Sequence, residues 1–312
     1  MKTMRWPGGV LVLAAVLVTV AACGGEGQND PPTEIEDAVY TTFYPLAWMA
    51  ERLAGDDIAV RCPIPADEDP IFWQPSRDAV AAFQNARLIA INGAEFEKWV
   101  ATASLPVSRV VETAAALQEP LITFKGDKHS HGGVDHVHEG VDGHTWVDPQ
   151  NAKVQAMKLA KAMAKTWPDH SPAIMQRVGD LQNALDRLHV RLLAMSSRVR
   201  EITLLTNHPA YNYLARRYQW KLKNFDLDPE EPIPNATLAK LAVGVEKAGV
   251  VRIMLWESAP NAATARLLED RFRVKSVVFS PLEARSEDDV ARGADYIKLM
   301  EENVSRLGAA LK

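Results

Sequence analysis

The chain has 312 residues, of which 47% are hydrophobic, enough to build one large or two medium-sized globular domains. Its 35 basic and 40 acidic residues give a net charge of −5 at neutral pH. This mild acidity argues against a nucleic-acid partner, because proteins that bind nucleic acids need a basic surface to neutralise phosphates.

The first 22 residues have the organisation of a bacterial secretion signal. Lys2 and Arg5 form a positive region, and residues 10–20 form an apolar run that is too short to span a bilayer stably. The sequence Val-Ala-Ala-Cys ending at Cys23 resembles a bacterial lipobox, which implies cleavage before Cys23 and lipidation of that cysteine. Acyl chains there would anchor the chain stably to a membrane. An ordinary secretory signal with an incidental cysteine is the alternative.

Residues 23–36 are polar, contain Gly and Pro and have little to bury, so we expect a flexible tether. The rest of the chain alternates short apolar runs with helical stretches, which is typical of α/β folds with mainly parallel sheets. Strands are expected at 37–43, 57–64, 87–93 and 108–112, and again at 201–207, 221–227, 250–257 and 274–280. Helices are expected at 44–54, 76–85, 94–103, 209–219, 235–248 and 261–272, and from about 286 to 309.

Residues 151–200, between the two sets of strands, are almost wholly helical in character. Pro168 and Pro172 interrupt this segment, and after Pro172 apolar residues recur every three or four positions. A continuous helix of that length would extend about 40 Å, long enough to run along both halves. We therefore predict two similar lobes, at 37–150 and 201–312, each a small, mainly parallel sheet flanked by helices, joined by a long linking helix.

Residues 125–143 break this pattern, because they are rich in Gly and charged residues and have almost nothing to bury. Four of the eight histidines lie in this predicted loop: His129, His131, His136 and His138. Imidazole suits zinc and neighbouring transition metals. We expect weak, auxiliary metal binding, because the loop would have to become ordered around the ion. A solvated loop without a ligand is the alternative.

Two further histidines stand at positions suited to a ligand site. His208 comes one residue after the predicted strand 201–207, and ligands of open α/β sheets bind beyond the carboxyl ends of strands. His144 follows the His-rich loop in the segment HTWVDP. Taken alone, each could equally be a buried or helix-capping histidine.

Several segments, taken in order, resemble the zinc- and manganese-binding lipoproteins of ABC importers. HTWVDPQNA resembles a family segment that supplies a metal-binding histidine, which points to His144, and TNHPAYNYLARRYQW resembles a second one, which points to His208. NGAEFEKWV (92–100), DPEEPIPNATLAKL and IMLWESAPNAATARLL resemble further family segments, and a His-rich loop before HTW is a feature of zinc-directed members. The resemblance implies two α/β lobes joined by a long helix, with the metal between them.

The sequence departs from the family pattern at two expected ligand positions. Ile71 stands where a loop of the family carries a histidine, and Ser280 stands where a carboxylate usually lies at a strand end. The candidate replacements are nearby carboxylates: Glu68, Asp69, Glu257 and Glu283. With these carboxylates, the metal would be bound by more oxygen ligands, which are harder Lewis bases than imidazole nitrogen. The alternatives are a solvated acidic loop, a salt bridge or cap at Glu257, and closure of the site by histidines of the loop.

We therefore predict a monomeric metal-binding protein, anchored outside the cytoplasm to a bacterial membrane, that delivers zinc, in preference to manganese, to an ABC permease. A metal-buffering or metallochaperone lipoprotein that mainly uses the His-rich loop is the alternative. A zinc hydrolase is a third hypothesis. The sequence lacks a Ser-centred elbow, a Gly-rich phosphate loop and an HExxH pair, so we expect no enzymatic activity.

Overall fold

The computed structural model describes residues 34–65, 68–124, 128–131, 134–137, 140–247 and 251–312. Residues Ile35–Lys312 form one compact unit. The predicted signal peptide, Cys23 and His138 lie outside the described residues. Among the residues that are described, no helix combines the length and the apolar character needed to cross a bilayer.

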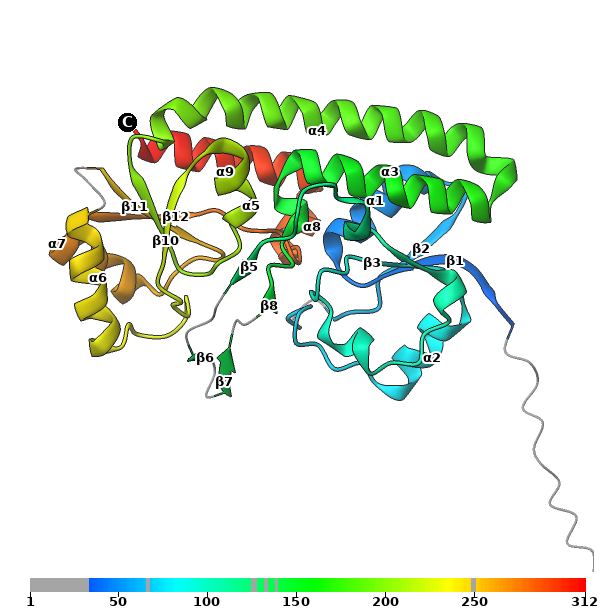
Figure 1. Cartoon of the computed structure of the whole chain (residues 1–312), viewed down its shortest axis with the longest axis horizontal. Coiled ribbons are helices and arrows are strands. Elements are labelled where there is room, and N and C mark those ends of the chain that lie inside the picture. Colours follow the sequence, from blue (N-terminus) through cyan, green and yellow to red (C-terminus); the bar gives the residue numbers. More distant parts are fainter. Residues whose placement is uncertain (1–33, 66–67, 125–127, 132–133, 138–139, 248–250) are drawn as a thin grey trace, which may run out of the picture. The chain divides into compact units, whose positions relative to one another are not determined.

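A first parallel sheet has the strand order β2-β1-β3-β4 (Figure 1). Its strands are β1 (Glu36–Thr41), β2 (Ala59–Arg61), β3 (Ala86–Ile91) and β4 (Val110–Glu112), and helices α1 (Tyr44–Ala54) and α2 (Arg77–Asn85) connect them. Successive residues of β1 enter different apolar clusters, because side chains alternate across a strand: Val39 joins the largest cluster and Tyr40 a smaller one on the other face. Burial on both faces explains the continuous apolar run in the sequence.

The second sheet, in the order β10-β9-β11-β12, repeats this topology. Its strands are β9 (Thr203–Thr206), β10 (Lys221–Asn224), β11 (Arg252–Trp256) and β12 (Val274–Val278), connected by α5 (Asn212–Tyr218), α6 (Asn235–Lys247) and α7 (Ala262–Phe272). In both sheets the second strand along the chain lies at one edge and the fourth at the other. The prediction of two similar α/β lobes is confirmed.

The linking segment contains α3 (Pro149–Thr166) and the 29-residue α4 (Ser171–Val199). Pro168 lies in the short turn between them, and Pro172 lies in the first turn of α4, where a missing N–H costs nothing. The buried stripe of α4, which includes Leu181 and Leu188, belongs to the largest apolar cluster. Helix α4 packs against α3 of the same segment, against α1 of the first lobe and against α9 of the second (Figure 1). This confirms the long linking helix.

The predicted helix at 94–103 is instead a turn followed by a short 3-10 helix, Lys98–Ala101. Gly93, Ala94 and Glu95 have φ angles of 76°, 52° and 58°, which a right-handed helix cannot contain. The Glu97 carboxylate accepts hydrogen bonds from the backbone of Asn92 and Gly93, and so holds the turn.

The predicted closing helix is also divided, into α8 (Glu287–Ala291) and α9 (Tyr296–Ala310). Gly293, at φ 60°, reverses the chain, and Asp295 then caps α9 by accepting a hydrogen bond from the Lys298 N–H. At the two ends of the predicted His-rich segment, β5 (Thr123–Phe124) pairs with β8 (Gly140–Val141). The segment predicted as a His-rich loop also contains a short hairpin of β6 (Lys128–His131) and β7 (Val134–Val137), in which His129 pairs with His136.

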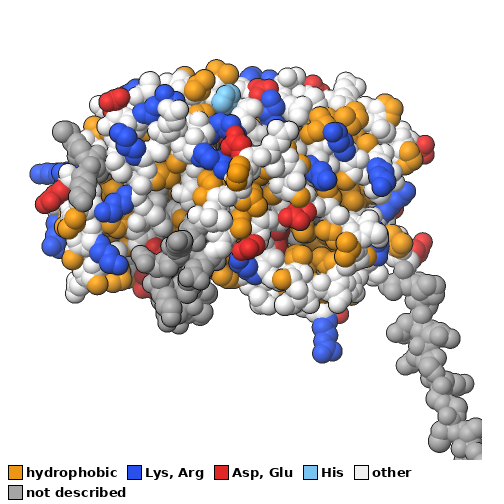
Figure 2. Space-filling view, viewed as in Figure 1, with side chains coloured by type: hydrophobic (Ala, Val, Ile, Leu, Met, Phe, Trp, Pro, Cys, Tyr) orange, Lys and Arg blue, Asp and Glu red, His pale blue; other side chains and the backbone are white. Residues whose placement is uncertain are grey.

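Basic and acidic side chains are interspersed over the face of the molecule drawn in Figure 2. Elsewhere in the described chain, charged side chains are paired, as in the contacts of Arg191 with Glu301 and of Arg177 with Asp57. Exposed pairs of this kind contribute only about 0–1 kcal/mol each. The stability of the fold therefore depends mainly on its buried apolar clusters.

Candidate metal centre

Three predicted site residues, His144, His208 and Glu283, converge on one point. Their candidate ligand atoms all lie within 4.8 Å of one another. The two imidazole centroids are 5.2 Å apart, and His144 Nε2 is 2.9 Å from Glu283 Oε1. The three side chains are only 6%, 12% and 17% exposed, in that order. Two imidazoles and one carboxylate at this spacing form a donor set that can hold a divalent transition metal.

Each donor is positioned by a different connection of the fold. His144 directly precedes the short helix Thr145–Val147, and the Asn92 side chain of the first lobe binds the neighbouring Gly143 carbonyl. His208 and Glu283 follow the carboxyl ends of β9 and β12 in the second lobe, which is where open α/β sheets bind ligands. The cluster is therefore shared between the two lobes.

Direct hydrogen bonds join the lobes around this cluster. The Trp146 indole donates to the Pro281 carbonyl at 2.8 Å, and the Tyr296 hydroxyl donates to the Trp146 carbonyl at 2.7 Å. The Tyr213 hydroxyl donates to the Asp142 carbonyl at 2.8 Å. The relative position of the three donors is therefore fixed by contacts of buried residues, and not by the donors alone.

Asp142, which is fully buried, sets the orientation of the His144 ring. Its Oδ1 accepts a hydrogen bond from the His144 backbone N–H at 3.0 Å and lies 2.8 Å from His144 Nδ1, while its Oδ2 accepts from Asn212. A carboxylate behind a metal-binding imidazole fixes its tautomer and increases its basicity. The sequence analysis missed Asp142 because it assigned the residue to a solvated loop; an acid two residues before a candidate histidine was the available signal.

The pKa values of the two imidazoles are shifted in opposite directions. Burial alone would lower the pKa of His144, but the hydrogen bonds and charges of Asp142 and Glu283 outweigh it and raise this pKa to about 10. Burial, together with the positive charge on His144, lowers the pKa of His208 to about 4. Burial would raise the pKa of Glu283, but its contact with His144 produces a net lowering. A metal ion would therefore have to displace the proton that His144 shares with Glu283.

The other predicted carboxylates are not members of the three-residue cluster. Glu257 Oε2 lies 4.0 Å from His208 Nδ1, and the Asn207 amide holds Glu257 Oε1 at 3.0 Å. Asp69 is exposed in the loop before Ile71, where desolvation by neighbouring atoms and the negative charge of Glu283 raise the pKa of its carboxyl group to about 6. Glu68 is exposed in the same loop.

The two positions that depart from the family pattern have other roles in the structure. The half-buried Ile71 packs against the largest apolar cluster. The Ser280 hydroxyl accepts a hydrogen bond from the Leu282 N–H in the turn that leads to Glu283.

The fold and the cluster together define a class: a two-lobed α/β binding protein with a candidate metal centre where its lobes meet. Residues 39–310 match the family described as ZnuA: Zinc-uptake complex component A periplasmic. This match covers most of the chain, and the chain therefore belongs to that family.

Individual relatives agree with this assignment. The chain is 29% identical over 304 residues to the zinc-binding lipoprotein AdcA of Streptococcus pneumoniae serotype 4, with 96% of this chain and 60% of the relative covered. It thus spans about 60% of the length of AdcA. It is 27% identical over 318 residues to the high-affinity zinc uptake system protein ZnuA of Bacillus subtilis, with 98% of both chains covered.

Solved structures show the same fold. The metal-dependent lipoprotein YcdH from Bacillus subtilis superposes with a TM-score of 0.77 at 24% identity, covering 88% of this chain and 98% of that one. The Zn(II)-bound ZnuA-like domain of Streptococcus pneumoniae AdcA superposes with a TM-score of 0.75 at 25% identity, covering 88% and 99%.

Proposed function

We propose that this protein is the extracytoplasmic zinc-binding component of an ABC importer, which captures zinc between its lobes and delivers it to a permease. The convergence of His144, His208 and Glu283 carries this proposal. Two imidazoles favour zinc over manganese, which prefers a site made of oxygen ligands. The names of the relatives, a zinc-binding lipoprotein and a zinc uptake protein, support the same cargo.

For the ligand set, we propose these three residues as the metal donors. Asp69 is the proposed fourth donor, because it lies two residues before Ile71, the position at which the family pattern carries a histidine. Glu257 is proposed to support His208 from its Nδ1 side. Glu68 remains the other acidic candidate of the first loop. The auxiliary weak contacts proposed for the hairpin region involve His129, His131, His136 and His138.

The N-terminal segment is proposed to be a signal peptide, residues 1–22, followed by lipidation of Cys23 and a tether. Membrane anchoring of a monomer would keep the binding protein near its permease. AdcA and YcdH are both named as lipoproteins, which supports this proposal. We propose binding without catalysis, in keeping with a family of solute-binding proteins.

Calorimetric titration of the metal-free mature protein is expected to show one tight zinc site per chain. A variant with His129, His131, His136 and His138 all changed to Ser should keep this site, because the cluster lies outside the hairpin. Loss of tight binding in this variant, leaving only weak sites, would overturn the transport proposal and favour a metal buffer.

Replacing Asp142 with asparagine is expected to weaken zinc binding about 10–100-fold, the usual cost of losing the carboxylate behind a metal-binding histidine. Asparagine keeps the size of the buried group but presents an amide in place of one carboxylate oxygen. Competition with a chromophoric chelator would measure the affinity. Asp186→Asn, which alters an ion pair between Asp186 on α4 and Lys153 on α3, is the matched control. Equal affinities of the two variants would contradict the orienting role of Asp142.

A further inference from the structure

Glu283 follows a turn in which three successive backbone carbonyls, those of residues 279–281, each accept a hydrogen bond from a side chain. The Tyr211 hydroxyl donates to the Phe279 carbonyl at 2.8 Å. The Asn303 amide donates to the Ser280 carbonyl at 2.8 Å, immediately before the Trp146 contact with Pro281 described above. All three donor side chains, which belong to Tyr211, Asn303 and Trp146, are fully buried. Three buried donors on three successive carbonyls specify one backbone path for this turn.

Inside the turn, the chain reverses at Leu282. The Ser280 hydroxyl accepts a hydrogen bond from the Leu282 N–H at 3.1 Å, and Leu282 has a φ of 63°. A leucine adopts this left-handed conformation only where its surroundings hold it there. The side chain of Leu282 is buried in the largest apolar cluster, while the next residue, Glu283, reaches His144 Nε2. The position of the Glu283 carboxylate therefore depends on the conformation of Ser280 and Leu282.

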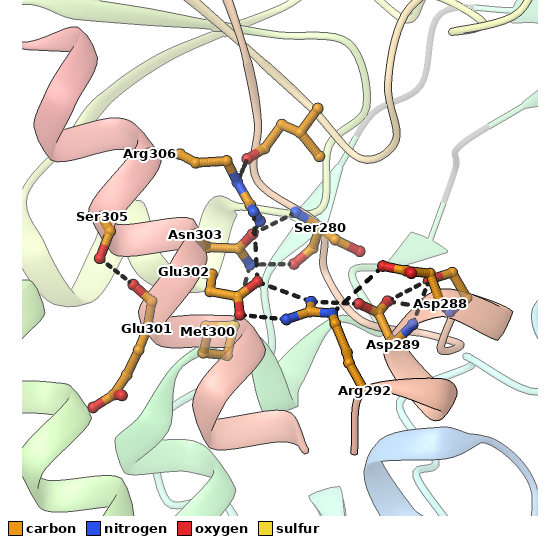
Figure 3. Close-up of polar contacts among 12 residues, drawn as sticks. Ser280, Asp288, Asp289, Arg292, Met300, Glu301, Glu302, Asn303, Ser305 and Arg306 are labelled. Carbon is orange, nitrogen blue, oxygen red and sulfur yellow. Dashed lines mark hydrogen bonds and ion pairs between the residues drawn. The ribbon is translucent and has the colours of Figure 1, made fainter. Parts of the chain in front are cut away.

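Among the described residues, the Asn303 side chain on α9 is the one that binds both the backbone N–H and the backbone carbonyl of Ser280. Its Oδ1 accepts a hydrogen bond from the Ser280 N–H at 3.1 Å, while its Nδ2 donates to the Ser280 carbonyl (Figure 3). Arg306 donates to the same Oδ1 at 2.6 Å and to the Val278 carbonyl at 2.8 Å. Arg306 therefore fixes which end of the amide faces each group, because only the oxygen of Asn303 can accept from a guanidinium.

We infer that Asn303 is a positioning residue for the metal site: by locking Ser280 it holds the turn that brings Glu283 to His144 and His208. This inference rests on the proposed zinc-binding function. It assigns to the C-terminal helix a part in cargo binding although no residue of α9 belongs to the donor cluster. The alternative is that Asn303 merely fastens α9 to the end of β12.

A double-mutant cycle on zinc affinity separates these two roles. Asn303→Ala is expected to weaken zinc binding about 10–100-fold, the range for groups that orient a metal ligand. In a Glu283→Gln background, the same change should have little further effect, because the donor that Asn303 positions is already impaired. If Asn303→Ala weakens binding by the same factor in both backgrounds, or leaves the affinity unchanged while lowering Tm, the inference is overturned.

Two further variants test whether the effect of Asn303→Ala comes from misfolding or from any change on α9. Asn303→Asp keeps the acceptor for Ser280 and Arg306 but loses the donor to the Ser280 carbonyl, so it should fold and show a smaller loss that also disappears with Glu283→Gln. Ser305→Ala, on the same helix, removes a hydrogen bond to the Glu301 carbonyl and one from Arg191, and should leave zinc affinity unchanged.

One further variant, His144→Ala, distinguishes the failure of the proposed function from the failure of the positioning role. If His144→Ala binds zinc as tightly as the unmodified protein, the proposed function itself fails, whatever Asn303 does. If His144→Ala loses binding while both Asn303 variants bind normally, only the positioning role fails.

Discussion

Replacing His144 with alanine is expected to weaken zinc binding by more than about 100-fold, beyond the 10–100-fold loss caused by removing a group that only orients a ligand. His144 is the central member of the cluster, since its ring lies 5.2 Å from that of His208 and 2.9 Å from the Glu283 carboxylate. Without it, only the two members of the cluster that belong to the second lobe, His208 and Glu283, would remain. His208→Ala is expected to cause a loss of similar size. Competition titrations against chelators of graded affinity would measure both.

The same change also removes the positive partner of two buried carboxylates. Asp142 and Glu283 would then face each other across the space left by the ring, and loss of one partner of a buried ion pair costs about 3–5 kcal/mol. Denaturant unfolding of the metal-free variant should reveal this decrease, and circular dichroism should show that the remaining protein is folded. His170→Ala, which removes an imidazole from the turn between α3 and α4, is the control. A His144 variant with the zinc affinity of this control would reject the site.

Replacing Glu97 with alanine is expected to lower the free energy of unfolding by about 3 kcal/mol or more. The buried Glu97 carboxylate accepts hydrogen bonds from the Thr42 hydroxyl at 2.6 Å and from the backbone N–H groups of Asn92 and Gly93 at 2.6 and 3.1 Å. Alanine would leave these three donors buried without a partner, at about 1–3 kcal/mol for each. Urea unfolding monitored by tryptophan fluorescence would measure the change.

The effect of Glu97 should extend to the metal site, because Asn92 donates to the Gly143 carbonyl at 2.9 Å, next to His144. Zinc affinity of the folded variant should therefore fall as well. Glu246→Ala removes the same charge from an exposed position on α6 and should change stability by no more than about 0.5 kcal/mol. If the Glu97 and Glu246 variants unfold at the same urea concentration, the buried network is not what holds this turn.

Much of the fold was accessible from the sequence because burial leaves a strong pattern there. The central strands of both sheets, β1, β3, β9 and β11, are mostly buried, and the buried stripe of α4 follows the helical period over its whole length. The error at 94–103 has a specific cause: the Glu97 side chain supplies the hydrogen bonds that stabilise a left-handed turn, and periodicity does not register such a contact. The break at Gly293 has a local cause instead: a glycine in the left-handed conformation and the cap that Asp295 supplies to α9.

The candidate site was less accessible. His144 and His208 stand out by their segments, and His208 also by its place after a strand. The sequence could not single out Glu283 from the other carboxylates, because its placement depends on the left-handed conformation of Leu282 and on Asn303 from a distant helix. Asp142 was hidden because its burial comes from long-range contacts with Asn212 and Tyr213. Each of these features is a tertiary contact that local sequence does not encode.

The unbroken α4 has a consequence for how cargo could be handed over. A single helix packs against α1 and α3 at one end and against α9 at the other, and it therefore restricts rotation of the lobes relative to each other. Zinc binding should change the angle between the lobes very little. Under the proposed function, a permease would then have to distinguish the zinc-bound protein from the zinc-free protein by the surface of the short loops around residues 142–144 and 280–285. The permease would then recognise the local shape and charge of these loops, and not a change in the arrangement of the two lobes.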